Sequence, residues 1–182
     1  KPFRKCCGKP LSPTQRALGK RAPPPRWVPL SDGRLLAPDD AMTMAISLQR
    51  AGQHVDAAEI YNAILAALPD HADALHLLAL TKRHSGRFEE AVELILRAIA
   101  INPNAALFHS NLSEAYRNLN KTAEAKAAAL RALTLDPRLP EAALNLGMAL
   151  FLQQDYPGAI EAHRLALRLR PGYLDAEIGI GD

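Results

Sequence analysis

The chain has 182 residues, of which 48% are apolar and 23% charged, and its formal net charge at pH 7 is +3. This apolar content is ample for a hydrophobic core. No run approaches the ~18 consecutive apolar residues of a membrane-spanning helix, and no secretory signal is visible. We therefore predict a cytoplasmic protein that has no membrane partner.

The first part of the chain is a basic, proline-rich segment. Residues 1–37 hold nine Lys or Arg against one acid, Asp32, giving +8, while residues 38–182 hold thirteen against eighteen, giving −5. Residues 1–37 also contain seven prolines and show no helical periodicity, which predicts an extended or mobile segment, with residues 11–37 as an irregular linker. Basic segments can bind nucleic acid, but more often they are solvated linkers. Nucleic-acid binding is therefore the less favoured interpretation.

Cys6 and Cys7 are the only cysteines and are adjacent, which excludes an ordinary disulfide between distant elements. They lie in the stretch Lys1-Pro2-Phe3-Arg4-Lys5-Cys6-Cys7-Gly8. This stretch resembles the second half of the SEC-C zinc motif of the bacterial preprotein translocase motor. The resemblance implies that residues 1–10 are a partial zinc motif, in which Cys6 and Cys7 supply two of four ligands and the other two precede Lys1. The alternative is a functionally inert cysteine pair in a basic tail.

From residue 38 onwards, similar residues recur every 34 positions. The windows 38–71, 72–105, 106–139 and 140–173 superpose, and each has a proline two residues before its end and an alanine at one shared position. The prolines are Pro69, Pro103, Pro137 and Pro171, and the alanines are Ala57, Ala91, Ala125 and Ala159. A period of this length is typical of a solenoid built from two-helix units.

The repeated residue types explain how such a unit forms. Small residues allow two helix axes to approach closely, and large neighbours fill the grooves between them. A proline near the end of each second helix stops that helix. We predict an all-α, right-handed solenoid of four helix pairs, with a truncated fifth unit at residues 174–182. Because the chain starts without methionine and stops inside that unit, we expect it to be part of a longer protein.

The repeat pattern resembles the tetratricopeptide repeat family over about four fifths of the chain. Asn145-Leu146-Gly147, Tyr116, Gly52 and Gly86 occupy positions of the family pattern, as do Ala98, Ala132 and Ala166. Ile64 departs from the second alanine, and Asn120 and Gln154 replace the glycine in the middle of the unit. The resemblance implies a concave surface lined by the first helix of each pair.

Helical spacing of i, i+3, i+7 and i+10 identifies the residues on one face of each first helix. These positions change chemistry from unit to unit, as a binding surface would, although a solvated face also varies freely. Together with two asparagines beside them, they form the predicted peptide-binding set. The set is Asp73, His76, Leu80, Arg83, Ser110, Asn111, Glu114, Arg117, Leu144, Asn145 and Met148.

Asn111 and Asn145 stand one period apart. An amide both donates and accepts hydrogen bonds, so a row of asparagines can hold the backbone of an extended peptide. Such a row resembles the superhelix of O-GlcNAc transferases, and similar sequences occur in bacterial repeat proteins joined to sulfotransferase domains. The alternative is that each asparagine bonds the adjacent helix.

No metal-binding His-Glu-x-x-His, glycine-rich phosphate loop or Gly-x-Ser-x-Gly motif is present, so we predict no enzyme activity and no cofactor in the repeats. Met42 and Ile46 stand where repeats that clamp acidic chaperone termini carry Lys and Asn. The favoured function is a protein-interaction scaffold that holds an extended peptide or partner helix in its concave groove. The alternative is the substrate-recruiting arm of a glycosyltransferase or sulfotransferase whose catalytic domain lies beyond residue 182.

Overall fold

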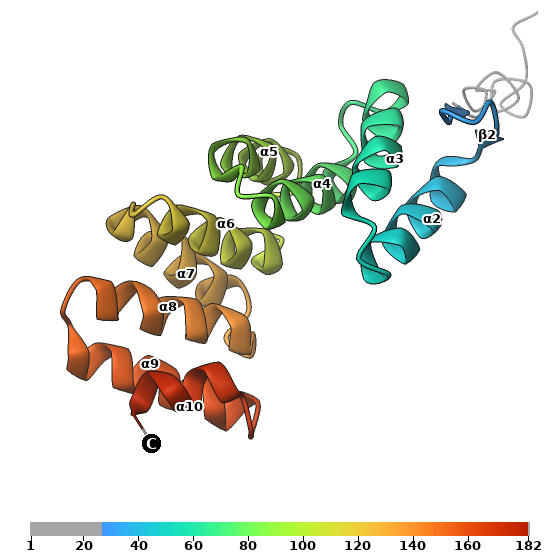
Figure 1. The fold of residues 1–182 in the computed structure, drawn as a ribbon. Coiled ribbons are helices and arrows are strands. Elements are labelled where there is room, and N and C mark those ends of the chain that lie inside the picture. The colour runs from blue at the N-terminus through green and yellow to red at the C-terminus, as the bar shows by residue number, and fades with distance from the viewer. Residues whose placement is uncertain (1–26, 182) are drawn as a thin grey trace, which may run out of the picture.

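The computed structural model describes residues 27–181. Within this range the chain forms a short β-hairpin followed by nine α-helices. The first helices of the successive units are α2 (Pro38–Arg50), α4 (Ala72–His84), α6 (Ala106–Asn118), α8 (Pro140–Leu152) and α10 (Leu174–Ile180). The second helices are α3 (His54–Ala67), α5 (Phe88–Ile101), α7 (Thr122–Leu135) and α9 (Tyr156–Leu169). The pairs stack in sequence order into an elongated, curved array (Figure 1), which confirms the all-α solenoid.

Within each pair, the chain reverses through one residue in the left-handed backbone region. This residue is Gly52 (φ 80°), Gly86 (φ 74°), Asn120 (φ 56°) and Gln154 (φ 64°) in the four units. Glycine adopts this conformation without a steric cost and asparagine tolerates it, whereas glutamine does so rarely. The turn geometry is therefore kept even where the glycine of the repeat pattern is replaced.

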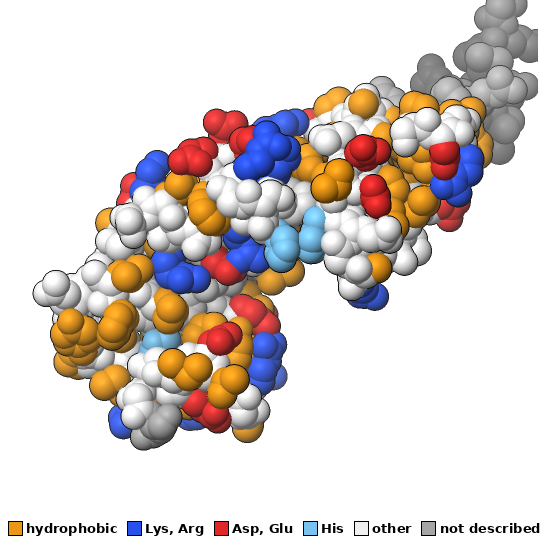
Figure 2. Space-filling model, in the orientation of Figure 1, with side chains coloured by type: hydrophobic (Ala, Val, Ile, Leu, Met, Phe, Trp, Pro, Cys, Tyr) orange, Lys and Arg blue, Asp and Glu red, His pale blue; other side chains and the backbone are white. Residues whose placement is uncertain are grey.

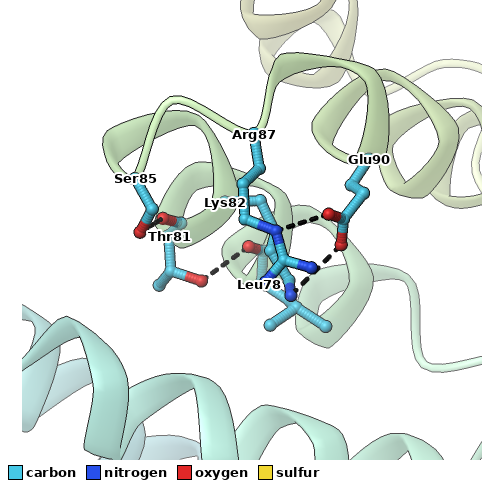
Figure 3. A network of polar contacts seen from close by, with 6 residues as sticks. All are labelled: Leu78, Thr81, Lys82, Ser85, Arg87 and Glu90. Carbon is cyan, nitrogen blue, oxygen red and sulfur yellow. Dashed lines mark hydrogen bonds and ion pairs between the residues drawn. The ribbon is translucent and has the colours of Figure 1, made fainter.

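Polar contacts hold the turn between α4 and α5 (Figure 3). The Thr81 hydroxyl donates to the main-chain carbonyl of Leu78 at 2.7 Å, and the Ser85 hydroxyl donates to the carbonyl of Thr81 at 3.0 Å. Glu90 forms ion pairs with Arg87 and, at 3.3 Å, with Lys82. Because Lys82 lies on α4 and Glu90 lies on the first turn of α5, these contacts fix the start of α5 against α4.

The hairpin differs from the irregular linker predicted for residues 11–37. Strands β1 (Val28–Pro29) and β2 (Leu35–Leu36) pair antiparallel. Val28 is fully buried and belongs to the core of the first repeats, together with residues of α2 and α3. The prediction is therefore wrong for residues 28–36, because the two strands pair and Val28 packs in the core of the first repeats. The cysteine pair Cys6 and Cys7 lies outside the described residues.

Candidate functional site

A pocket of about 530 Å³ lies along the first helices α6, α8 and α10. We call it the groove pocket. Its lining includes six residues of the predicted peptide-binding set: Asn111, Glu114, Arg117, Leu144, Asn145 and Met148. It also includes Glu141, Phe151, His163, Tyr173, Asp175, Ile178 and Gly179. In Figure 2, apolar side chains gather over α8 and α10, with acidic side chains among them.

The other predicted residues lie outside this pocket. Asp73, Leu80 and Arg83 are on α4, where Asp73 is exposed and the other two are half-buried. His76 and Ser110 are 3% and 0% exposed, respectively. The sequence predicts these two residues on the groove surface, but the structure places them beneath it, because the neighbouring first helix covers them.

The two asparagines use their amide nitrogens to join successive first helices. Asn145 Nδ2 donates to the carbonyl oxygen of Ser110 at 3.0 Å and to its hydroxyl oxygen at 3.1 Å. Asn111 Nδ2 lies 2.6 Å from His76 Nε2. Each contact joins residues that are 35 positions apart. The two contacts are one 34-residue period apart, so they are equivalent contacts in successive repeats. The alternative interpretation, in which asparagine bonds the adjacent helix, is therefore confirmed for both nitrogens.

The amide oxygens of both asparagines have no donor within the described part of the chain. Among residues 27–181, no hydrogen bond is donated to Oδ1 of Asn111 or of Asn145. Because each nitrogen is fixed to the preceding repeat, the orientation of each amide is also fixed. The groove therefore presents two acceptors of defined direction, one from α6 and one from α8.

His76 is held as a neutral imidazole. Burial lowers its pKa to about 4, the nearby Asp73 opposes this shift, and Arg83 adds to it. A neutral imidazole has one acceptor nitrogen, which suits the amide hydrogen of Asn111 at Nε2. The ring also packs on Phe108, with centroids 4.5 Å apart. His76 thus anchors α6 to α4 and is not free to contact a ligand.

Two ion pairs involve glutamates of the groove pocket, one between repeats and one within a repeat. Glu114 Oε1 pairs with Arg83 of the preceding repeat and lies 4.0 Å from Arg117 on its own helix. Glu141 Oε1 pairs with Arg170, whose guanidinium carbon lies 4.6 Å from the centre of the Tyr173 ring. These pairs are partly exposed, so each contributes little to stability. Each pair is made through Oε1 of the glutamate.

His163 is a lining residue that the sequence prediction missed. It belongs to the second helix α9 and is 0% exposed, and neither ring nitrogen has a hydrogen-bond partner among the described residues. Burial lowers the pKa of its imidazole. A Cβ added at Gly147 would lie 2.6 Å from the ring, and one added at Gly179 would lie 2.5 Å from it. Two glycines, on α8 and α10, therefore make room for the ring.

A comparison of the repeats in the sequence could have identified His163. One, two and three periods earlier, the position of His163 holds Ala129, Ile95 and Tyr61. The position of Gly147 holds Ser113, Ala79 and Ala45 at the same steps. In the fourth unit, the bulky polar His163 is thus combined with Gly147, the smallest residue found at its position.

The arrangement defines a class of protein, an α-solenoid of two-helix repeats with a groove along the first helices. Two family models, each described as tetratricopeptide repeat, match residues 48–114 and 111–173. Together they span residues 48–173, which is more than half of the chain. The chain belongs to the tetratricopeptide repeat family, whose repeats typically form non-catalytic scaffolds for protein interactions.

Solved structures show the same fold. MamA has 23% sequence identity and a TM-score of 0.69, over 79% of each chain. Pseudomonas aeruginosa PilF has 22% identity and a TM-score of 0.73, over 80% of this chain and 66% of PilF. The first repeat domain of Spaghetti (RPAP3), bound to the HSP90 peptide SRMEEVD, has 23% identity and a TM-score of 0.59, over 60% of this chain and 87% of that domain.

The search of curated proteins gives no match. None of the helices in residues 27–181 has the length and apolar character needed to cross a bilayer.

Proposed function

We propose that this scaffold binds an extended segment of a partner protein along the groove, with the groove pocket as its main contact. The observation that carries the proposal is the pocket itself, which combines apolar side chains with unused hydrogen-bond acceptors on three successive repeats. The RPAP3 repeat domain, which shares the fold, is bound to a peptide. The likeness supports a peptide ligand for the present chain.

The amide oxygens of Asn111 and Asn145 are suited to accept hydrogen bonds from the backbone N–H groups of such a segment. Their nitrogens are already bonded to His76 and Ser110, so binding does not require the amides to become ordered. Contacts of this kind are independent of the ligand's side chains. Each hydrogen bond contributes about 0.5–1.5 kcal/mol to binding.

Apolar side chains of α8 supply the remaining affinity. Leu144 and Met148 are half-buried in the pocket wall, and Phe151 at the end of α8 is 52% exposed. Large exposed aromatic residues are frequent anchors of binding energy. Asp73, Leu80 and Arg83 extend the same surface onto α4 and offer contacts to a longer ligand.

The expected ligand differs from the acidic peptide bound to RPAP3. Met42 and Ile46, on α2, stand where carboxylate-clamping repeats carry Lys and Asn. No feature of residues 27–181 favours the alternative of a substrate-recruiting arm for a transferase.

Selection from a displayed library of random 12-residue peptides tests the proposal, followed by calorimetry on the selected peptides. We expect Phe151→Ala to weaken binding at least tenfold, because it removes an exposed aromatic anchor from the groove. The matched control is Leu130→Ala, which removes a side chain of similar exposure, 45%, from the second helix α7. Selected peptides that are indifferent to Phe151→Ala but sensitive to Leu130→Ala would contradict the proposal.

A further inference from the structure

A second pocket, of about 650 Å³, lies between the hairpin, α2 and α3. We call it the end pocket, because these elements lie at the opposite end of the array from α8, α9 and α10 (Figure 1). We propose that it binds the basic segment 9–21 of the same chain. This inference goes beyond the proposed function, since the end pocket and the groove pocket share no lining residue.

The floor of the end pocket is apolar and accessible. Its apolar side chains come from the hairpin, α2 and α3: Leu30, Met44, Leu48, Ile60 and Ala63. All of them except the buried Ile60 are half-buried, so part of their surface still contacts solvent. Covering this surface with apolar side chains of a ligand is favourable.

The rim of the end pocket is acidic. Asp32, Asp56 and Glu59 are exposed, and the described lining contains no basic residue. Asp32 pairs with Arg34 at 2.6 Å, whereas Asp56 accepts a hydrogen bond only from the neutral Gln53, and Glu59 has no partner within residues 27–181. In Figure 2, acidic side chains lie among apolar ones over this end of the molecule.

The neighbouring charges do not cancel this acidic rim. The hairpin and the first repeat up to the end of α3, residues 27–67, contain five acidic residues and two basic ones, a net charge of −3. The two basic residues are Arg34, which already pairs with Asp32, and Arg50, which is not in the lining. A cleft lined by one sign of charge raises the local concentration of ligands of the opposite sign.

This charge belongs to the first repeat and is not a general property of the fold. The equivalent surface of the fourth repeat also forms a pocket, of about 580 Å³. There, three periods after Asp56 and Asn62, the positions hold Gly158 and Arg164, and the lining carries a net charge of +1. The two pockets therefore favour ligands of opposite charge.

The segment that precedes the hairpin has the complementary composition. Residues 1–26 lie outside the described range, and they contain eight Lys or Arg and no acidic residue. Residues 9–21 include two leucines with basic residues two positions away: Leu11 after Lys9, and Leu18 between Arg16 and Lys20. An apolar floor with an acidic rim suits leucines that are flanked by basic side chains, whose methylene groups also pack on apolar surface.

The connection to the hairpin is long enough for this contact. Residue 21 is six positions before Trp27, a distance that an extended chain spans with about 20 Å. Trp27 directly precedes β1, and the turn after β1 lines the pocket through Leu30, Ser31 and Asp32. Because the segment is tethered, its effective concentration at the pocket is high, and individually weak contacts are sufficient for binding.

Paramagnetic relaxation measured by NMR on the full chain tests the inference. Cys7→Ser leaves Cys6 as the only thiol, and a nitroxide spin label is attached to it, three positions before Lys9. We expect the label to broaden the backbone amide signals of Ile60, Asn62 and Ala63. The signals should recover in ~1 M salt, where the screening length falls to about 3 Å. Full intensity at low salt, or broadening that persists at high salt, would overturn the inference.

Carboxylate variants separate binding in the pocket from mere proximity of a tethered segment. Asp56→Asn combined with Glu59→Gln should remove most of the broadening. The control, Asp39→Asn combined with Asp40→Asn, removes two exposed carboxylates from α2 that do not line the pocket, and should leave the broadening unchanged. Equal effects of the two pairs, or no effect of either, would contradict the inference.

A variant of the segment tests the apolar part of the contact. Leu11→Ser combined with Leu18→Ser keeps every charge of the segment and should also remove most of the broadening, because the floor loses its apolar ligand. Broadening that survives this change would reduce the contact to a general attraction between opposite charges, and the assignment to residues 9–21 would be wrong.

A mixing experiment identifies the molecule that supplies the segment. Spin-labelled chains without isotope are mixed with isotope-labelled chains that carry Cys6→Ser and Cys7→Ser. We expect no broadening in this mixture, because the segment binds the pocket of its own chain. Broadening of the Asn62 and Ala63 signals in the mixture would assign the pocket to a second copy and overturn the inference.

Discussion

The contact between Gly147 and His163 gives the sharpest test of the packing. A side chain added at Gly147 would place its Cβ between 2.6 and 2.8 Å from three atoms of the imidazole. Overpacking of this kind costs about 1–3 kcal/mol. Serine has a higher helix propensity than glycine by about 0.5 kcal/mol, which offsets part of the loss. We therefore expect Gly147→Ser to lower the free energy of unfolding by about 1–2 kcal/mol.

The third repeat shows how this loss can be reversed. There, Ser113 and Ala129 occupy the positions of Gly147 and His163, and the Ser113 hydroxyl donates to the carbonyl of Ala125 at 2.7 Å. The fourth repeat has the equivalent residue, Ala159, one period later. Combining Gly147→Ser with His163→Ala therefore copies a pair that this fold already accommodates.

Alone, His163→Ala leaves a cavity, which costs a few kcal/mol for a side chain of this size. In the double variant the new serine occupies part of that cavity and gains a hydrogen bond worth about 1 kcal/mol. We expect a favourable coupling energy of about 1–3 kcal/mol between the two substitutions. Urea unfolding followed by circular dichroism measures it in all four proteins. If the losses in the free energy of unfolding of the two single variants add up to the loss in the double variant within about 0.5 kcal/mol, the view that His163 requires glycine at position 147 is refuted.

Two further predictions concern the left-handed turn and the buried histidine. Gln154→Gly should stabilise the protein by about 0.5–1 kcal/mol in thermal unfolding, because it relieves the positive φ of 64°. Asn120→Gly should stabilise the protein by a smaller amount, because asparagine tolerates a positive φ better than glutamine does. If both variants were less stable than the original protein, the prediction would be wrong. Folding stability should be greatest above pH 6.5 and fall as the pH drops towards 4, because the unfolded chain binds a proton that native His76, with its pKa of about 4, does not. The loss reaches about 3 kcal/mol. His76→Leu, which copies Leu144 from the same position of the fourth repeat, should flatten this pH dependence in urea unfolding, and an unchanged slope would assign it to other groups.

The sequence was sufficient to predict the helix pairs, because prolines, small residues and turn residues recur at one fixed period. Asn120 and Gln154 did not obscure this pattern, since the other positions of their units remained in phase. The hairpin was not predictable in this way. Val28 is buried through contacts with helices much further along the chain, and a two-residue strand has no periodicity of its own.

The groove was predictable only in part. Spacing along one helix identifies the residues that share a face, and it correctly brought Glu114, Arg117 and Met148 together in one pocket. It does not show which of those residues the next first helix covers, and so His76 and Ser110 were misplaced. Their burial depends on contacts that span 35 residues.

The inward direction of the asparagine nitrogens also changes what the groove can recognise. A free amide both donates and accepts, and would hold a peptide backbone through either kind of group. Here the donors of both amides join α4 to α6 and α6 to α8, so each asparagine offers the groove only its acceptor oxygen. The pocket lining also contains the carboxylates of Glu141 and Asp175, and the guanidinium of Arg117, whose Nε donor has no partner among the described residues. In the proposed function, the two asparagines are therefore suited to backbone N–H groups of the bound segment and not to its carbonyl groups. The bonds that stabilise the stacking of the repeats thus also determine which hydrogen-bonding group each asparagine presents in the groove.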